Sequence, residues 1–142
     1  MSVELSDYDE SWPARYTAEA DQIRAALGAE LRRIEHVGST AVPGLVAKPV
    51  VDVALSVEDI AAVDLEALGY VRDADLTDGV SFRREGFHVR AYELEPDDFL
   101  DHLRIRDYLR SHPEDRDAYA EAKRRDAKGL YIGRLAEMLR RG

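Results

Sequence analysis

The sequence predicts a single α+β domain over residues 1–142, with a small mixed β-sheet and helices packed on it. Two observations lead to this prediction. The expected elements run from one helix through several strands to two helical regions, an order that fits neither a helical bundle nor an all-β barrel. In addition, hydrophobic residues make up 45% of the chain, which is enough apolar material for the core of one ordinary domain.

The first expected element is a helix from about Ser11 to Leu27. Ser11 is a candidate N-cap, and Pro13 lies early in the helix, where its missing N–H costs nothing. Gly28 ends the helix. Its apolar face consists of residues that recur at helical spacing, namely Trp12, Tyr16, Ala20, Ile23 and Leu27.

Two strands separated by a loop follow the helix. Residues 31–37 form the first predicted strand, residues 38–48 a loop with two glycines and one proline, and residues 49–56 the second strand. The second strand is apolar almost throughout and is interrupted by Asp52. This pattern predicts a central strand that is buried on both faces.

The sequence pattern in the middle of the chain predicts a short helix and further strands. The helix covers residues 57–68 and ends at Gly69, after which Tyr70 opens a strand. Residues 80–84 and 87–94 are separated by a glycine and predict a hairpin-like pair.

The C-terminal third is expected to be helical. Asp97 is expected to cap a helix that runs to about Ser111, where His112 acts as a helix-end cap. The last helical region covers residues 113–141 and is expected to bend near Gly129. The core face of the first of these helices is predicted to contain Phe99, Leu103, Tyr108 and Leu109.

Composition excludes several classes of protein. The chain has no cysteine, so disulfides, thiolate zinc sites and cysteine nucleophiles are excluded. The formal net charge of −9 predicts an acidic exterior, which argues against binding to duplex nucleic acid. No apolar run approaches the roughly 20 residues of a membrane helix, and no apolar stretch of a secretory signal follows the N-terminus. A cytoplasmic protein without a membrane partner is therefore expected.

The segment from His36 to Asp52 carries the pattern closest to chemistry. Gly38, Ser39 and Thr40 leave the first strand together, and small residues there expose backbone N–H groups and hydroxyls to a phosphate. Asp52 follows on the next strand. A Gly-Ser turn, a spacer and a strand with a carboxylate are typical of nucleotidyltransferases, in which carboxylates hold Mg²⁺ against a triphosphate. The alternatives are ordinary loop geometry for the glycines and a structural carboxylate for Asp52.

These residues define the predicted site for a nucleoside triphosphate or a related small phosphorylated ligand, with Mg²⁺ as the possible cofactor. Asp52 and Ser39 are the candidate catalytic residues. Asp52 and Glu93 are the candidate metal ligands. The residues expected to bind the phosphates are Gly38, Ser39, Thr40, Lys48, His36 and His88. For Lys48, a salt bridge to Asp52 or an ordinary surface charge is the alternative.

Other polar residues have two readings each. His36 and His88 are expected to face one cleft near Asp52, where hydrogen bonds to the loop or to a phosphate are preferred over a metal role. His102 is expected on a helix surface. Arg106 is expected in an ion pair, and the alternative is that it reaches the cleft. Strand arginines either pair with a triphosphate or lie on a solvated face of the sheet, and they are Arg83, Arg84 and Arg90.

The motif extends beyond this general pattern. Ile34-Glu-His-Val-Gly-Ser-Thr-Ala-Val-Pro-Gly-Leu-Val-Ala-Lys-Pro-Val-Val-Asp-Val53 closely resembles the signature of the GrpB family, also called UPF0157. Residues 8–16 resemble the opening helix of that family, and residues 106–114 with Tyr119 and Lys123 resemble its C-terminal motif. The resemblance implies a nucleotidyltransferase-like fold. Some members are fused to dephospho-coenzyme A kinase, which points toward nucleotide or coenzyme metabolism by association.

Three departures from an active nucleotidyltransferase bear on function. Ala54 occupies the position where a second carboxylate is usual, two residues after Asp52 on the same strand face. The later strand offers Glu93 and Glu95 as its acids. A helical segment also looks absent near residues 125–128. The first hypothesis is therefore a nucleotide-binding protein that transfers a nucleotidyl group with Mg²⁺, and the second is a non-catalytic nucleotide-binding or regulatory module. A third and weaker hypothesis is a relative of toxin–antitoxin or RNA-modifying nucleotidyltransferases.

Overall fold

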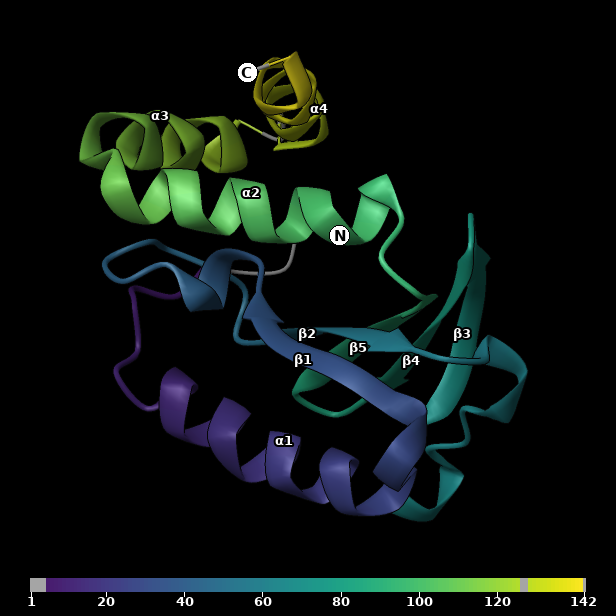
Figure 1. Ribbon diagram of the computed structural model, residues 1–142. Coiled ribbons are helices and arrows are strands. Elements are labelled where there is room, and N and C mark those ends of the chain that lie inside the picture. The colour runs from purple at the N-terminus through teal and green to yellow at the C-terminus, as the bar shows by residue number, and fades with distance from the viewer. Residues whose placement is uncertain (1–4, 126–127, 142) are drawn as a thin grey trace.

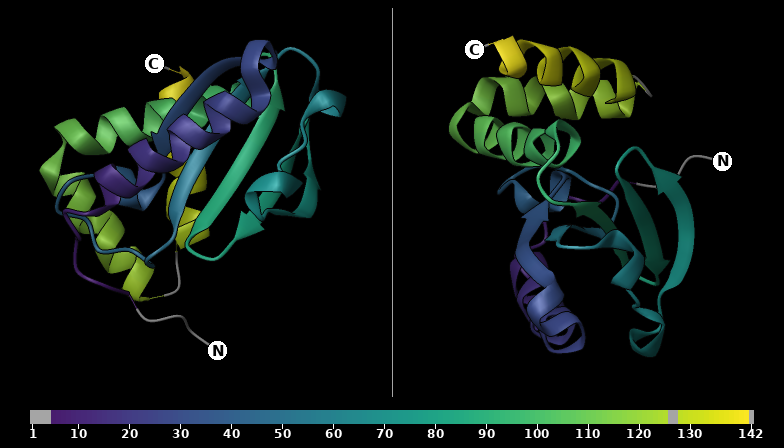
Figure 2. Two further views of the ribbon diagram at one scale, coloured as in Figure 1. Left: turned by 90° about the horizontal axis from the view of Figure 1, so that it is seen from below. Right: turned by 45° about the vertical axis from the view of Figure 1, so that its right-hand side comes forward.

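The computed structural model describes residues 5–125 and 128–141, and its elements form three layers (Figure 1). One helix covers one face of a five-stranded sheet, and the three C-terminal helices lie beyond the other face. The right-hand view in Figure 2 shows the same separation of the first helix from the last three. The helices are α1 (Trp12–Leu27), α2 (Asp97–Ser111), α3 (Pro113–Arg124) and α4 (Lys128–Arg141), and the strands are β1 (Leu31–Val37), β2 (Val51–Val57), β3 (Val71–Leu76), β4 (Gly79–Arg84) and β5 (Phe87–Glu93).

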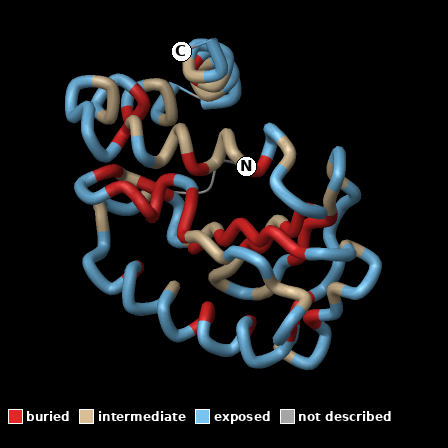
Figure 3. Tube along the Cα trace, in the orientation of Figure 1, coloured by how far each residue is buried: buried red, intermediate tan, exposed pale blue. Residues whose placement is uncertain are grey.

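The sheet is mixed, which confirms the predicted fold class. Its strand order is β1-β2-β5-β4-β3, and β2 runs parallel to β5 and antiparallel to β1. β2 is thus an inner strand, and Figure 3 shows the middle of the sheet as the most continuously buried part of the chain. The expected strand starting near Tyr70 and the hairpin of β4 and β5 are also present.

Alternation along β2 assigns its side chains to two faces. Val51, Val53 and Leu55 join Trp12 and Ile23 in the core on the α1 side. Ala54 joins Phe99 and Leu103 on the α2 side, together with Val37 and Tyr92. Asp52 has the same parity as Ala54, so its carboxylate lies on the α2 side of the sheet.

α1 begins and ends where the sequence predicts, but its N-terminus is capped differently. Ser11 occupies the N-cap position without a side-chain cap bond. Its backbone N–H instead donates to Asp9 Oδ1 at 2.8 Å, so Asp9 orders the approach to the helix. The predicted apolar face is otherwise confirmed, since Trp12, Ala20 and Ile23 are fully buried.

The prediction of a helix over residues 57–68 is wrong. The segment contains two short 3₁₀ turns, Ile60–Ala62 and Glu66–Leu68. Asp59 accepts a hydrogen bond from the backbone N–H of Ala61, and Asp64 accepts one from that of Glu66. Aspartate side chains that capture nearby backbone donors compete with helix formation, and this explains the error.

The C-terminal region differs from the prediction at its breaks. Pro96, rather than Asp97, is the N-cap of α2, and the last region is two helices with α4 starting at Lys128, so Gly129 lies inside α4. His112 caps α2 as predicted, because its Nδ1 lies 2.8 Å from the carbonyl oxygen of Tyr108. Across the helices described, none is both long and apolar enough to cross a membrane.

Candidate functional site

Gly38 brings the loop after β1 against the start of β2. Val37 pairs with Asp52 in the sheet, and Gly38 then turns the chain with a φ of +73°. A Cβ on residue 38 would lie 2.5 Å from Asp52 Oδ2. Only glycine therefore allows both the left-handed backbone and this close approach, which sets the loop directly beside the carboxylate.

Asp52 is held by two basic neighbours on β5. Its Oδ1 lies 3.2 Å from Nη1 of Arg90 and 3.5 Å from Nδ1 of His88. Burial raises the pKa of the Asp52 carboxyl, but His88 and Arg90 outweigh burial and keep the pKa below its usual value. The group is therefore an ionised, already partnered carboxylate at neutral pH.

Ser39 meets the C-terminal helices across the cleft. Lys123 Nζ on α3 donates to Ser39 Oγ at 2.6 Å and to the carbonyl oxygen of Val46 at 2.9 Å. The hydroxyl of Tyr119 lies 3.4 Å from the same Ser39 Oγ. Burial lowers the pKa of Lys123 to about 7, and repulsion from Lys128 acts in the same direction.

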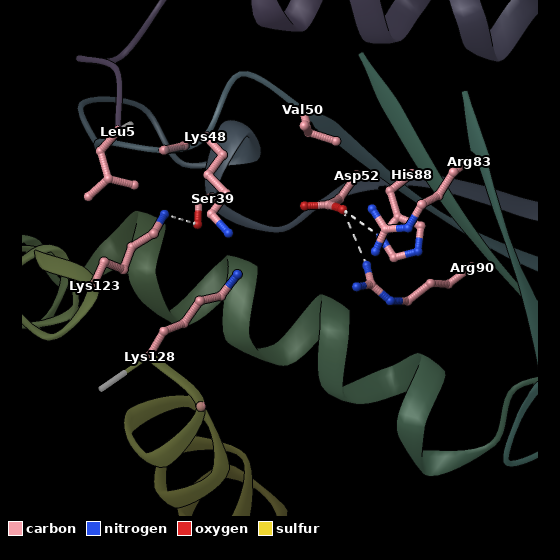
Figure 4. A pocket seen from close by; sticks show the side chains of 12 residues that line it. Leu5, Ser39, Lys48, Val50, Asp52, Arg83, His88, Arg90, Lys123 and Lys128 are labelled. Carbon is pink, nitrogen blue, oxygen red and sulfur yellow. Dashed lines mark hydrogen bonds and ion pairs between the residues drawn. The ribbon is translucent and has the colours of Figure 1, made fainter. Parts of the chain in front are cut away.

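The space between these groups is a cavity of about 290 Å³, seen from close by in Figure 4. Its wall carries five cationic side chains and one carboxylate, in a chain whose net charge is −9. The carboxylate is Asp52 and the cations are Lys48, Arg83, Arg90, Lys123 and Lys128. All three lysines of the sequence therefore line one cavity, which makes it a local concentration of positive charge.

Part of the predicted site is assembled here. The structure brings Ser39, Lys48, Asp52 and His88 to one cavity wall, with Gly38 packed against Asp52. Among the salt bridges within residues 5–125 and 128–141, none involves Lys48, so its alternative role as a salt bridge to Asp52 is not what the structure shows.

His36 and Thr40 do not join this group. His36 Nε2 lies 2.8 Å from Thr40 Oγ1, and the imidazole stacks on Tyr16 of α1 with ring centroids 4.8 Å apart. Burial lowers the pKa of His36 to about 4, so the ring is neutral. The expectation that both histidines face one cleft near Asp52 is corrected, because alternation along β1 turns His36 toward α1.

Glu93 lies far from Asp52. Asp52 pairs with His88 in the sheet, whereas Glu93 pairs with Val57, five residues further along. At about 3.3 Å per residue this separates the two carboxylates by roughly 16 Å along the strands. Glu93 Oε1 instead accepts from the backbone N–H of Ile60, on the α1 side of the sheet. The expected convergence of Asp52 and Glu93 on one ion is therefore not found.

The donor set does not fit a protein-held Mg²⁺. The single carboxylate of the cavity is already paired with Arg90, and Ala54 is a buried core residue in place of a second ligand. Within the described part of the chain, no three His, Asp or Glu side chains are grouped so that they could hold a metal ion. Magnesium at phosphate sites is usually held by one or two carboxylates together with waters and substrate phosphates, and this wall offers Asp52 as its one carboxylate.

Sequence reasoning missed two of the cavity's cations. Lys123 and Lys128 come from the C-terminal helices, and Lys123 is 84 positions from the serine it contacts. The signal available was the rarity of lysine in an arginine-rich chain. Arg106 forms the predicted ion pair, with Glu35 at 2.7 Å, and lines a second cavity and not the cleft of the alternative prediction.

That second cavity adjoins the first and has a volume of about 200 Å³. His102 lines it, which corrects the prediction of a helix-surface residue. Its Nε2 lies 2.9 Å from the hydroxyl of Tyr92, and burial lowers its pKa to about 4. A polar side chain on α2 thus turned toward the sheet because Tyr92 offers a partner there.

Comparisons with known proteins agree with the fold and the motif. A model of the family described as GrpB protein matches residues 2–133. A UPF0157 protein of Halalkalibacterium halodurans is 40% identical over 139 residues, covering 89% of this chain and 70% of its own length. A dephospho-CoA kinase of Mycolicibacterium paratuberculosis is 36% identical over 111 residues, covering 72% of this chain and 27% of the kinase. The crystal structure of conserved protein GrpB from Enterococcus faecalis is similar with a TM-score of 0.88, at 28% identity over 96% of each chain.

The sheet, its covering helices and the Gly-Ser turn beside Asp52 define an α+β protein of the nucleotidyltransferase-like kind. The chain belongs to the GrpB family. The match covers 96% of the solved GrpB chain. The position where a segment was expected to be absent, next to residues 126–127, lies outside the described residues.

Proposed function

We propose that the protein binds a nucleoside triphosphate, or a related small phosphorylated ligand, with its phosphates in the cleft between Ser39 and Arg90. The observation that carries this proposal is the cleft's charge: Arg90 pairs with Asp52 and Arg83 pairs with Asp73, whereas no salt bridge among the described residues involves Lys48, Lys123 or Lys128. A triphosphate supplies the compensating negative charge, and lysine and arginine donors suit its oxygens.

The Ser39 hydroxyl supports the same ligand class. It lies at the cleft wall and accepts from Lys123 Nζ at 2.6 Å, so the serine hydroxyl and the lysine amine offer neighbouring donors to a phosphate. His88 also lines the cleft, but its two ring nitrogens lie near carboxylates, with Nδ1 3.5 Å from Asp52 Oδ1 and the buried Nε2 4.0 Å from Asp73 Oδ2. The imidazole therefore helps to hold the carboxylates at the cleft and is not counted as a phosphate ligand.

The geometry favours binding over nucleotidyl transfer. Ala54 replaces the second carboxylate, Glu93 lies elsewhere and Asp52 is engaged by Arg90. In this proposal the lysines neutralise the phosphates directly, and Mg²⁺ enters only as the counter-ion that a triphosphate brings with it. The small cleft and the acidic exterior favour a small molecule over a nucleic acid. The similarity to a protein named dephospho-CoA kinase is in keeping with a phosphorylated ligand.

Calorimetry tests the proposal directly. Titrating the protein with ATP, GTP, CTP and UTP is expected to give binding in the micromolar to millimolar range usual for substrate sites. Binding is expected to persist in EDTA, because protein cations and not a protein-held metal neutralise the phosphates. Absence of heat for all four nucleotides, in a sample with a cooperative unfolding transition, would rule the proposal out.

The affinity is expected to depend on pH through Lys123, whose pKa is lowered to about 7 by burial. Only the protonated amine neutralises a phosphate, so binding is strongest below the pKa and weakens above it. For one such group the dissociation constant rises about tenfold for each pH unit beyond the pKa. Titrations at pH 7, 8 and 9 are expected to show this trend. Titrations in buffers of different ionisation enthalpy at pH 8 are expected to show proton uptake. A flat profile over this window would contradict the role of Lys123.

A further inference from the structure

A second cavity opens beside the phosphate cleft and differs from it in chemistry. Its apolar wall comes from the loop after β1 and from helices α2 and α4, through Val42, Ile105, Leu109 and Ile132. The two cavities share Asp52, Arg90 and Lys128 as lining residues, so they meet at these three side chains. The two cavities are therefore direct neighbours.

Apart from Lys128, which it shares with the cleft, the second cavity has polar groups that carry little unmatched charge. Arg106 donates to Glu35 Oε1 at 2.7 Å, to Asp107 Oδ1 at 2.9 Å and to the carbonyl oxygen of His36 at 3.1 Å. His102 is neutral, because burial lowers its pKa to about 4. Tyr119 adds a partly apolar ring. The cavity is thus suited to an uncharged group with apolar faces and a polar edge, and not to a second phosphate.

We propose that this cavity binds the heterocyclic base of the nucleotide whose phosphates occupy the cleft. The inference rests on the proposed function and adds the part of the ligand that the cleft does not hold. Asp52 lies at the boundary as an ionised carboxylate, placed where the sugar joins base and phosphates and able to accept from its hydroxyls.

The sizes of the cavities support one ligand across both. Small-molecule sites usually measure about 300–1,000 Å³. The cleft, at about 290 Å³, and the second cavity, at about 200 Å³, each fall below that range alone. The two cavities share Asp52, Arg90 and Lys128 as lining residues, and their combined volume falls within the usual range. A nucleotide has the matching division, with a strongly charged chain on one side of the sugar and a flat ring on the other.

The experiment compares inorganic tripolyphosphate with nucleoside triphosphates, in the wild-type protein and in variants that fill the second cavity. In the wild type, at least one nucleoside triphosphate is expected to bind on the order of 10- to 100-fold more tightly than tripolyphosphate, because the base adds contacts of its own. Ile105→Trp on α2 and Ile132→Trp on α4 are expected to remove most of that advantage and to leave the affinity for tripolyphosphate within about twofold.

Leu130→Trp is the matched control, because Leu130 lies on α4 with 60% of its surface exposed and does not line the cavity. It is expected to keep the full advantage of the nucleotide. The two variants lie on different helices, so the test can still be carried out if one of them fails to fold.

The outcomes separate this inference from the proposed function. Equal affinity for tripolyphosphate and all four nucleotides in the wild type would overturn the base site and leave the phosphate cleft standing. Filling variants that fold and keep the full nucleotide advantage would overturn it as well. Failure of both ligand types to bind would overturn the cleft and the base site together.

Discussion

Replacing Lys123 with methionine is expected to weaken the binding of nucleoside triphosphates by about 10- to 100-fold. The lysine reaches from α3 across the cleft to Ser39 and carries one of the charges nearest to the Gly38 turn. Hydrogen bonds to charged groups contribute about 1.5–3 kcal/mol, and each 1.4 kcal/mol corresponds to a factor of about ten in affinity. Methionine keeps the length and the apolar stem of the side chain and removes the charge.

Arg124→Met provides the control for Lys123→Met. Arg124 is the next residue on α3, but its side chain is 55% exposed and faces Glu121, away from the lining of the cleft. Its replacement is expected to leave the affinity within about twofold, since an exposed ion pair contributes little. Calorimetry on both variants at pH 7 makes the comparison. Similar losses in the two variants would indicate a general charge effect and would contradict a specific role for Lys123.

Replacing Gly38 with alanine is expected to lower the free energy of unfolding by about 2–5 kcal/mol and to abolish measurable nucleotide binding. The left-handed backbone of a non-glycine residue costs about 1–2 kcal/mol. The new Cβ would also lie 2.5 Å from Asp52 Oδ2, and relieving such overlap typically costs about 1–3 kcal/mol. The carboxylate and the turn that bears Ser39 must therefore separate, which disrupts the cleft.

Gly86→Ala isolates the backbone part of that effect. Gly86 has a φ of +84°, but a Cβ there meets nothing within 4 Å. This variant is expected to lose only the backbone contribution and to bind nucleotides normally. Urea denaturation with an unchanged m-value gives the two free energies. Equal losses of stability in the two alanine variants would show that contact with Asp52 does not constrain residue 38.

The sequence predicted most of the fold because local signals and tertiary structure agree. The glycine after α1, the strand before Gly38 and the apolar run around Asp52 each appear at the expected place. The helix prediction for the segment that contains Asp59 and Asp64 failed because these side chains accept hydrogen bonds from backbone N–H groups that a helix needs. That competition depends on local geometry and is weakly encoded in hydrophobic spacing.

The candidate site was predictable only in part. The Gly38 turn and Asp52 belong to one contiguous motif, so their proximity followed from two neighbouring strands. Lys123 and Lys128 reach the cleft through the packing of the C-terminal helices, which sequence spacing does not reveal. Glu93 and His36 were misplaced because their faces depend on strand register. A shift of one residue along the strand decides whether a side chain points toward α1 or toward α2.

The central claim is that lysine and arginine side chains, and not a protein-bound metal, hold the phosphates of a nucleotide in this cleft. A crystal structure of the complex with a non-hydrolysable nucleoside triphosphate and Mn²⁺ tests it most directly. We expect phosphate oxygens within hydrogen-bond distance of Ser39, Lys123 and Arg90. We also expect the base in the adjoining cavity and any Mn²⁺ bound to phosphate oxygens alone. A metal ion coordinated by Asp52 together with another carboxylate, or phosphates bound elsewhere on the molecule, would contradict it.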